Sequence, residues 1–221
     1  MMRQRTLPHR LVKTSASNKY KRQRAVGKED TSMYELLSGQ HICLRKAKDT
    51  DYKSMLKHVW GNESVYRWML FQPTHTEADA LDRCRRSVLF QKDNYAYFIA
   101  LKDTDEAIGM CAIRESDPGH YEECGICIGT AYQGKGYGKE TVSLLLELAF
   151  EELHAEDFRY GFFHENERSK HLAERFGFQY DSSYEMIRPW DGRLKTVDSC
   201  LLTRENYMAS GKSGPVRSQR S

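Results

Sequence analysis

The sequence lacks any hydrophobic run long enough to cross a bilayer. A membrane-spanning helix needs about 20 consecutive apolar residues, and no window of the 221-residue chain comes near that length. The first residues are basic, but the apolar segment that follows the basic start of a secretory signal peptide is absent. These absences argue against a membrane protein and predict a soluble, cytoplasmic one.

The chain also lacks a second close pair of cysteines. Two residues separate Cys124 from Cys127, but a structural zinc site needs four ligands, often supplied by two such pairs. The segment around them has the composition of a strand, in which residues three apart point to opposite faces. All six cysteines fall in apolar runs, as is typical of reduced, buried thiols. We therefore predict no metal site.

Positive charge is scarce in the middle of the chain, although the total formal charge is +3. Residues 1–30 hold nine Lys or Arg and two acidic residues, and residues 212–221 hold three more basic residues. Because these ends carry about +10 together, the middle carries about −7. The ends contain too few apolar residues to offset their ordering entropy by burial. We predict disordered tails at 1–31 and 209–221 around one domain at 32–208.

A basic arm is compatible with contact to nucleic acid, which would then depend steeply on salt concentration. A solvated tail is the more ordinary interpretation of such a segment, so nucleic acid is an unlikely partner.

Hydrophobic periodicity predicts alternating helices and strands. Strands are expected at 41–45, 95–101, 107–114, 121–129, 158–163, 184–189 and 195–202. Helices are expected at 49–61, after an Asp49 cap, at 76–89, after a Thr76 cap, at 139–154, and before Gly177. A helix between the fourth and fifth strands makes them parallel. The result is an α+β fold with a mixed, mostly antiparallel sheet of about seven strands and about four helices.

A glycine-rich turn, Gln133-Gly134-Lys135-Gly136-Tyr137-Gly138, joins the fourth strand to the longest helix. Glycines at every second position let successive backbone N–H groups face one point at a helix N-terminus, where the helix dipole also favours an anion. The stretch is neither a Walker loop nor a dinucleotide-binding fingerprint. It predicts a phosphate-binding site, with an ordinary flexible loop as the alternative.

Three separated stretches together resemble the GNAT superfamily of N-acetyltransferases. Residues 123–129 are similar to the fourth strand of that family, 133–138 to its pyrophosphate loop, and 166–178 to the helix after its fifth strand. The ending at 198–207 resembles the branch that acetylates ribosomal-protein N-termini and small amines. The resemblance covers about 41–207 and implies the GNAT fold, with acetyl-coenzyme A as co-substrate.

The same resemblance implies roles for individual residues. The family binds the pantetheine arm in a gap between the fourth and fifth strands and the pyrophosphate at the glycine loop. The implied coenzyme-binding residues are Ile126, Cys127, Ile128, Gln133, Gly134, Lys135, Gly136, Tyr137, Gly138, Asn166 and Ser169.

The chemistry needs a base that takes a proton from the amine and a donor that stabilises the departing thiolate. Glu123 is the first candidate for the base, with Glu165 or His164 second. The tyrosine acid of many family members is replaced by Ala173 here. The candidates for the role of acid are Ser169, a water molecule, Tyr180 and Tyr184. Alternatively, no acid is needed, because a thiolate is a tolerable leaving group.

We therefore expect an acetyltransferase that moves an acetyl group from acetyl-coenzyme A to a primary amine by direct attack in a ternary complex. The amine belongs to a small molecule or to a peptide or protein N-terminus, and the acidic middle of the chain favours cationic acceptors. A non-catalytic acyl-coenzyme A sensor is the alternative. Aromatic residues that could line the acceptor pocket or belong to the core are Trp60, Trp68, Phe71 and Trp190. A homodimer is possible.

Overall fold

The fold is built on one mixed sheet. The computed structural model describes residues 34–211, in which eight strands lie in the order β1-β2-β3-β4-β5-β6-β8-β7. Their bounds are β1 Leu36–Ser38, β2 Ile42–Arg45, β3 Ala96–Leu101, β4 Ala107–Asp117, β5 His120–Ile128, β6 Asp157–Phe163, β7 Gln179–Ile187 and β8 Leu194–Thr203. All neighbours are antiparallel except β5 and β6, which run parallel. The predicted α+β class is confirmed.

Six α-helices accompany the sheet in the described part of the chain. They are α2 Tyr52–Met55, α3 Glu63–Tyr66, α4 Glu77–Gln91, α5 Tyr137–Glu147, α6 Glu167–Phe176 and α7 Arg204–Ala209. Short 3₁₀ turns cover Asp49–Asp51 and Thr130–Tyr132, and π-helical turns cover Leu56–Trp60 and Leu148–Glu152. The helix predicted at 139–154 therefore combines α5 with the π-helical turn after it.

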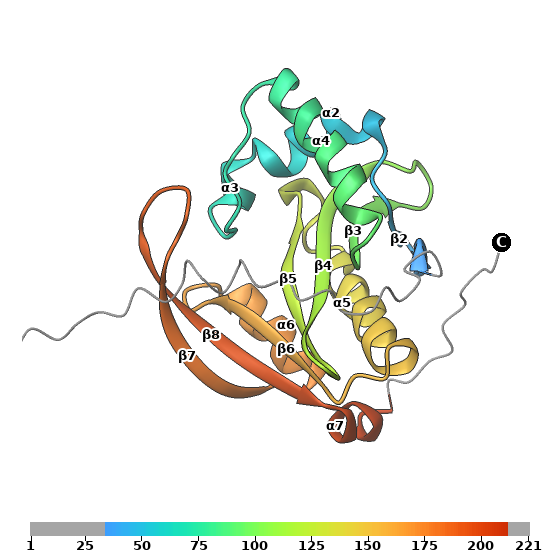
Figure 1. Ribbon diagram of the computed structural model, residues 1–221, viewed down its shortest axis with the longest axis vertical. Helices are drawn as coiled ribbons and strands as arrows, with labels where there is room; N and C mark the ends of the chain where they lie inside the picture. Colours follow the sequence, from blue (N-terminus) through green and yellow to red (C-terminus); the bar gives the residue numbers. More distant parts are fainter. Residues whose placement is uncertain (1–33, 212–221) are drawn as a thin grey trace, which may run out of the picture.

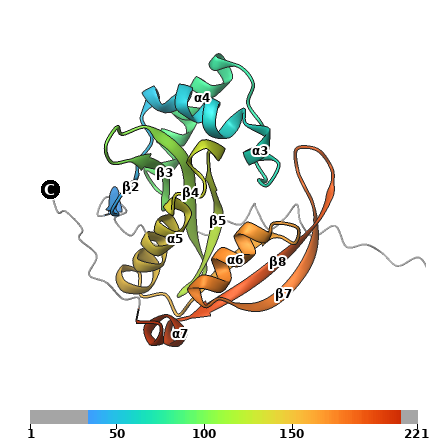
Figure 2. The same cartoon turned by 180° about the vertical axis from the view of Figure 1, so that it is seen from behind.

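Helices lie on both faces of the sheet. Figure 2 shows α5 and α6 side by side on one face, whereas α2, α3 and α4 gather over one end of the strands in Figure 1. Each group covers its own hydrophobic core. The larger core lies between the sheet and helices α5 and α6. In the smaller core, residues of α2 and α4 pack against residues of β3 and β4.

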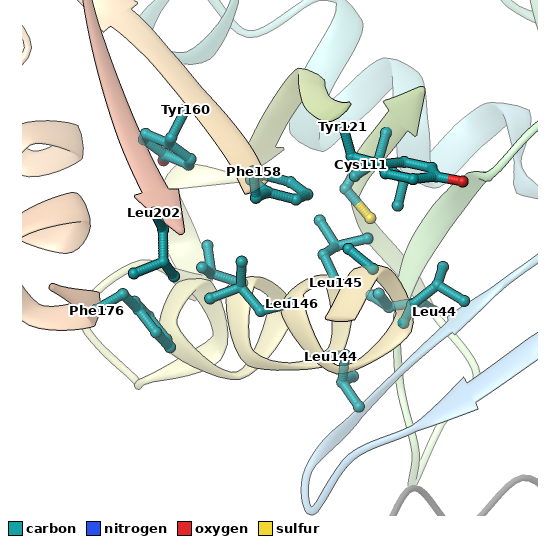
Figure 3. Packing of buried hydrophobic residues seen from close by; sticks show 14 of the residues in the cluster. Leu44, Cys111, Tyr121, Leu144, Leu145, Leu146, Phe158, Tyr160, Phe176 and Leu202 are labelled. Carbon is teal, nitrogen blue, oxygen red and sulfur yellow. The ribbon is translucent and has the colours of Figure 1, made fainter. Parts of the chain in front are cut away.

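The helix that follows the glycine turn is fixed by the larger core. Val142, Leu145, Leu146 and Ala149 are buried, as the helical spacing of apolar residues predicts. Figure 3 shows Leu145 and Leu146 among side chains of the sheet. Burial of one leucine side chain contributes about 1.5–3 kcal/mol, so several together hold α5 in a fixed position.

The parallel pair at the centre of the sheet is short. Three residue pairs join β5 and β6, from His120↔Asp157 to Glu122↔Arg159. Beyond Glu122 the two strands have no register, and Figure 1 shows them diverging toward the end where α3 lies. The backbone of β5 from Glu123 onward therefore pairs with β4 alone.

Some predicted counts were too low. The sheet has eight strands rather than about seven, because β1 is a three-residue strand that a sequence period cannot reveal. Helices α3 and α7 were also missed, since six residues or fewer do not complete two helical turns.

The cap predicted for the first helix was wrong as well. Asp49 lies inside the 3₁₀ turn, and it is Asp51 Oδ2 that accepts from the backbone N–H of Lys48 at 2.8 Å. Thr76 does cap α4 as predicted, since its side chain accepts from the N–H of Asp79.

Most of the two predicted tails lies outside the described residues, so 1–31 and all but 209–211 of the second tail stay predictions, as do the domain limits. Between residues 34 and 211, no helix is long and apolar enough to cross a membrane.

Glu140 joins α5 to the first strands. Its Oε1 accepts from the backbone N–H groups of His41 and Ile42 at 2.8 and 3.2 Å, and its Oε2 lies 3.2 Å from His41 Nδ1. The turn passes close to this carboxylate, because a Cβ added to Gly39 would lie 2.1 Å from Oε1. The carboxylate thus fixes the β1–β2 turn against the first turn of α5.

Substitution Glu140→Ala is expected to lower the free energy of unfolding by about 1–3 kcal/mol, because two backbone donors lose their acceptor. Urea unfolding measures the change. Asp82→Ala is the matched control: it removes an exposed helix carboxylate paired with Arg86, which contributes less than about 1 kcal/mol. Equal effects of the two substitutions would contradict the role of Glu140 in fixing the β1–β2 turn against α5.

Candidate functional site

The glycine turn adopts a backbone that only glycine accepts easily. Gly134 and Gly136 have φ of 78° and 89°, in the left-handed region. A Cβ added at either position would meet no atom within 4 Å, so the constraint is in the backbone and not in crowding. Gly136 is the N-cap residue of α5. The turn therefore faces open space in front of the helix N-terminus.

Several N–H groups of this turn have no acceptor in the part of the chain that the structure describes. Within residues 34–211, the backbone N–H groups of Gly134, Lys135, Gly136, Tyr137 and Gly138 donate to no recorded protein atom, whereas that of Glu140 donates to Gly136 O. The dipole of α5 adds partial positive charge at the same end. The main-chain groups of the turn thus have the arrangement and polarity that suit an anion.

Gln133 holds the turn in place from both sides. Its Nε2 donates to the carbonyl of Ile128 at 2.8 Å, and its Oε1 accepts from the guanidinium of Arg168 at 2.5 Å. Arg168 was not among the predicted site residues. It comes from the first turn of α6, and no local pattern shows that α6 begins beside the glycine turn.

The carboxylate of Glu123 lies where β5 and β6 separate. Its Oε2 accepts from the N–H of Gly125 at 2.7 Å, and the N–H of Gly161 on β6 donates to the same carboxylate. Gly161 is close enough that an added Cβ would lie 3.9 Å from Glu123 Oε1. The side chain therefore takes the acceptor position that a continued β5–β6 ladder would have filled.

Burial raises the pKa of Glu123 to about 7. The two N–H donors favour the charged form and lower the pKa, and Glu122 raises it slightly, but removal from water outweighs the donors. A carboxyl group with this pKa exchanges protons near neutral pH, which suits a general base.

Ser169 lies in the first turn of α6, on the other side of the gap. The Asn166 side chain caps this helix by accepting from the N–H of Ser169 at 3.3 Å. Ser169 Oγ lies 3.0 Å from the hydroxyl of Tyr160 on β6. Both hydroxyl-bearing residues, together with Asn166 and Glu123, line one cleft. Sequence reasoning missed Tyr160 because its alternation with Phe162 indicates only a core strand.

One continuous cleft joins these groups. Its volume is about 3990 Å³, several times the roughly 300–1,000 Å³ of an ordinary small-molecule pocket. It extends from Gly134 and Gly136 past Glu123 to the open face of β7 and β8, which includes Tyr184. The cleft is therefore larger than an ordinary pocket for one small molecule.

Two segments, 67–69 and 188–190, are joined by hydrogen bonds and form the roof of the cleft. The N–H of the Trp190 indole donates to Met69 O at 3.1 Å, and the Arg188 guanidinium donates to Arg67 O. Arg188 is buried and also pairs with Asp191. The β7–β8 hairpin is thereby fastened to the end of α3.

The aromatic residues considered for the acceptor pocket divide between roof and core. Trp68 and Phe71 line the cleft, and Trp190 fastens its roof. Trp60 is fully buried against Phe98 in the smaller core.

The other candidate bases are less suitable. His164 is 68% exposed and its Nδ1 lies 2.8 Å from Asp198 Oδ2. Glu165 lines the cleft, but a backbone N–H and Lys195 lower its pKa. A carboxylate with a lowered pKa is a weaker base than Glu123.

The remaining predicted residues lie around the turn and the open edge of β5. Lys135 Nζ lies over the Tyr132 ring, 5.6 Å from its centroid, and the Tyr137 ring packs beside His41. These two side chains thus point elsewhere than the N–H groups. The backbone at Ile126, Cys127 and Ile128 pairs with β4, and its other edge faces the gap. Gln133 already occupies the carbonyl of Ile128.

Cys127 is buried in the smaller core, and burial raises the pKa of its thiol to about 12, so this thiol is protonated and unreactive at neutral pH. Cys124 is exposed, so the prediction that all six cysteines are buried was wrong for this residue. Among residues 34–211, no group of three or more His, Cys, Asp or Glu side chains is arranged to hold a metal ion.

Known proteins share this sequence pattern. A family described as acetyltransferase (GNAT) domain matches residues 41–179, more than half of the chain. N-acetyltransferase p20 of Bacillus licheniformis, itself uncharacterized, is 26% identical over 176 residues, which cover 78% of this chain and 98% of the relative.

Solved structures share the fold. A GCN5-related N-acetyltransferase from Brucella melitensis has a TM-score of 0.69 at 19% identity, covering 79% of this chain and 80% of its own. A Vibrio cholerae protein provisionally described as a ribosomal-protein-serine acetyltransferase has 0.65 at 22%, covering 76% and 97%. The microcin C7 self-immunity acetyltransferase MccE, solved with acetyl-coenzyme A and AMP, has 0.64 at 15%, covering 74% and 93%. These identities support the fold alone.

The raised pKa of Glu123 predicts a pH-dependent stability. The unfolded chain releases this proton near pH 4.5 and the folded chain near pH 7, so between these values the folded state binds more protons. Its stability therefore falls as the pH rises through this window and levels off above it. Relative to Glu123→Gln, which has no such proton, the wild type should lose about 1–3 kcal/mol between pH 5 and pH 8. Urea unfolding of both proteins across this range measures the difference, and parallel curves would contradict the assigned pKa.

Proposed function

Because the chain belongs to the GNAT acetyltransferase family, we propose that it transfers the acetyl group of acetyl-coenzyme A to a primary amine within a ternary complex. Membership confirms the family predicted from the sequence and supports acetyl transfer in general. The proposal goes further on one observation: Glu123, with a pKa near 7, opens into the same cleft as the glycine turn.

The donor half of the cleft fits a coenzyme with a pyrophosphate and an amide-containing arm. The free N–H groups of the glycine turn bind the pyrophosphate, and the positive end of α5 stabilises its charge. The edge of β5 after Glu123 has no strand partner, so its backbone groups bind the amides of the pantetheine arm. The arm then leads the thioester toward Ser169.

The acceptor half delivers the amine to Glu123. An ammonium group must lose a proton before it attacks the thioester carbonyl, and a carboxylate with a pKa near 7 accepts that proton at neutral pH. Both reactants are oriented by the roof of the cleft and by the diverging ends of β5 and β6. Orientation supplies much of the rate in such reactions.

The acceptor is a cationic primary amine, carried by a small molecule or by a peptide or protein N-terminus. The net negative charge of the middle of the chain supports a cationic partner. The resemblance of residues 198–207 to the branch that acetylates ribosomal-protein N-termini and small amines supports both kinds of acceptor.

Substitution Gly136→Asp is expected to weaken acetyl-coenzyme A binding at least about 100-fold, because it adds a negative charge at an anion site and strains a left-handed residue. Isothermal titration with acetyl-coenzyme A, coenzyme A and ATP measures the affinity; the two coenzymes should bind and ATP should not.

The matched control is Gly177→Asp. Gly177 is also left-handed, with a φ similar to that of Gly136, but it lies at the C-terminal end of α6. It carries the same backbone strain without touching the turn. If both variants bind acetyl-coenzyme A like the wild type, the turn is not the coenzyme site.

Substitution Glu123→Gln is expected to lower kcat/KM about 100-fold at neutral pH. In the wild type, kcat/KM should rise with pH up to about 7 as Glu123 loses its proton, and this acidic limb should disappear in the variant. Thiol release from acetyl-coenzyme A with a panel of amines measures both effects.

Glu147→Gln is the control, since Glu147 is another carboxyl whose pKa burial raises, on the part of α5 away from the cleft. Its profile should match the wild type. An unaltered acidic limb in Glu123→Gln would remove Glu123 from the role of base. Coenzyme binding without thiol release for any amine would favour the sensor.

A further inference from the structure

Tyr160 and Ser169 form a hydroxyl pair at the edge of the cleft. Their oxygens lie 3.0 Å apart. Tyr160 is 4% exposed, and its ring packs against Phe178 with centroids 5.5 Å apart. Since packing fixes the ring and the cap at Asn166 fixes the start of α6, the two hydroxyls are held together by the fold.

Either hydroxyl could donate in this hydrogen bond, and counting protons favours donation by Tyr160. In the described part of the chain, the Tyr160 hydroxyl has Ser169 Oγ as its recorded partner and no second one. If Ser169 donated, the phenolic proton of Tyr160 would be buried without an acceptor, which native structures avoid. Donation from Tyr160 to Ser169 avoids this cost, and it leaves the Ser169 proton to point into the cleft that Ser169 lines.

The surroundings keep Tyr160 protonated. Burial raises the pKa of its hydroxyl far above the ordinary value, the negative charge of Glu123 raises it further, and the bond with Ser169 lowers it only in part. The phenol therefore remains a donor at any pH at which the protein works.

The place where many relatives carry a tyrosine acid offers no hydroxyl here. Ala173 is 2% exposed and belongs to the larger core. Of the two other tyrosines considered for this role, Tyr180 is exposed and bonds to Ser183, while Tyr184 lies on β7. Ser169 is thus the hydroxyl at the start of α6 that can face the thioester.

We propose that Tyr160 is a positioning residue that orients the Ser169 hydroxyl toward the sulfur of the departing coenzyme A. This inference rests on the proposed function. In the reaction, Glu123 takes the first proton from the ammonium and releases it to solvent; the neutral amine nitrogen then bonds to the acetyl carbon, and the second proton passes to Glu123. The carbon–sulfur bond then breaks with its electron pair on sulfur. The thiolate accepts a hydrogen bond from Ser169 and takes a proton from water after release.

Substitution Tyr160→Phe keeps the ring and removes the hydroxyl. It is expected to lower kcat about three- to tenfold, the worth of one hydrogen bond that acts in the transition state. The Kd of acetyl-coenzyme A should stay unchanged, because the free turn that binds it is untouched. Tyr97→Phe is the matched control: it removes a buried hydroxyl that has no hydrogen-bond partner among the described residues, and kcat should not change.

A double-mutant cycle with Ser169→Ala tests whether Tyr160 acts through Ser169. In the Ser169→Ala background, Tyr160→Phe should cause no further loss of kcat. A loss of the same size in both backgrounds, an unchanged kcat in Tyr160→Phe, or a loss that appears only in Kd would overturn the inference while the proposed function stands. Absence of wild-type thiol release with every amine would overturn both.

Discussion

The short parallel pairing of β5 and β6 is the constraint on which the rest of the site depends. Because three residue pairs join these strands, the sheet is continuous at one end and open at the other, and two thirds of β5, from Glu123 to Ile128, has an edge without a strand partner. Unpaired backbone groups inside a protein are costly. The chain reduces this cost with the Glu123 carboxylate, which accepts from Gly125 and Gly161. The group that stabilises the divergence is therefore the group with the most useful pKa in the cleft.

The elements with a long hydrophobic period could be predicted from the sequence. The buried face of α5, the cap at Thr76 and the left-handed end of α6 at Gly177 follow from residue spacing and local backbone preference. The glycine turn could also be predicted from the sequence, because its alternating glycines favour a conformation with exposed N–H groups. These features depend on neighbours within a few positions, which is the range that a sequence pattern encodes.

What could not be predicted depends on residues far apart in the chain. Strand β1 exists because it pairs with β2, and its three residues have no period of their own. Arg168 reaches Gln133 across 35 positions, and the carboxylate of Glu123 on β5 meets Gly161 on β6, the next strand along the chain after the glycine turn and α5. The value of Glu123 as a base was a guess from position; the burial that sets its pKa appears only when β5 and β6 are placed together.

One half of the cleft is lined by main-chain groups and the other by side chains. The glycine turn offers main-chain N–H groups, and its two left-handed residues admit almost no other amino acid. The roof offers side chains, from the end of α3 and from the β7–β8 hairpin, which touch each other rather than the turn. Substitutions accumulated over evolutionary time can therefore alter the roof, and with it the choice of one reactant, while the recognition of the other reactant is inherited unchanged.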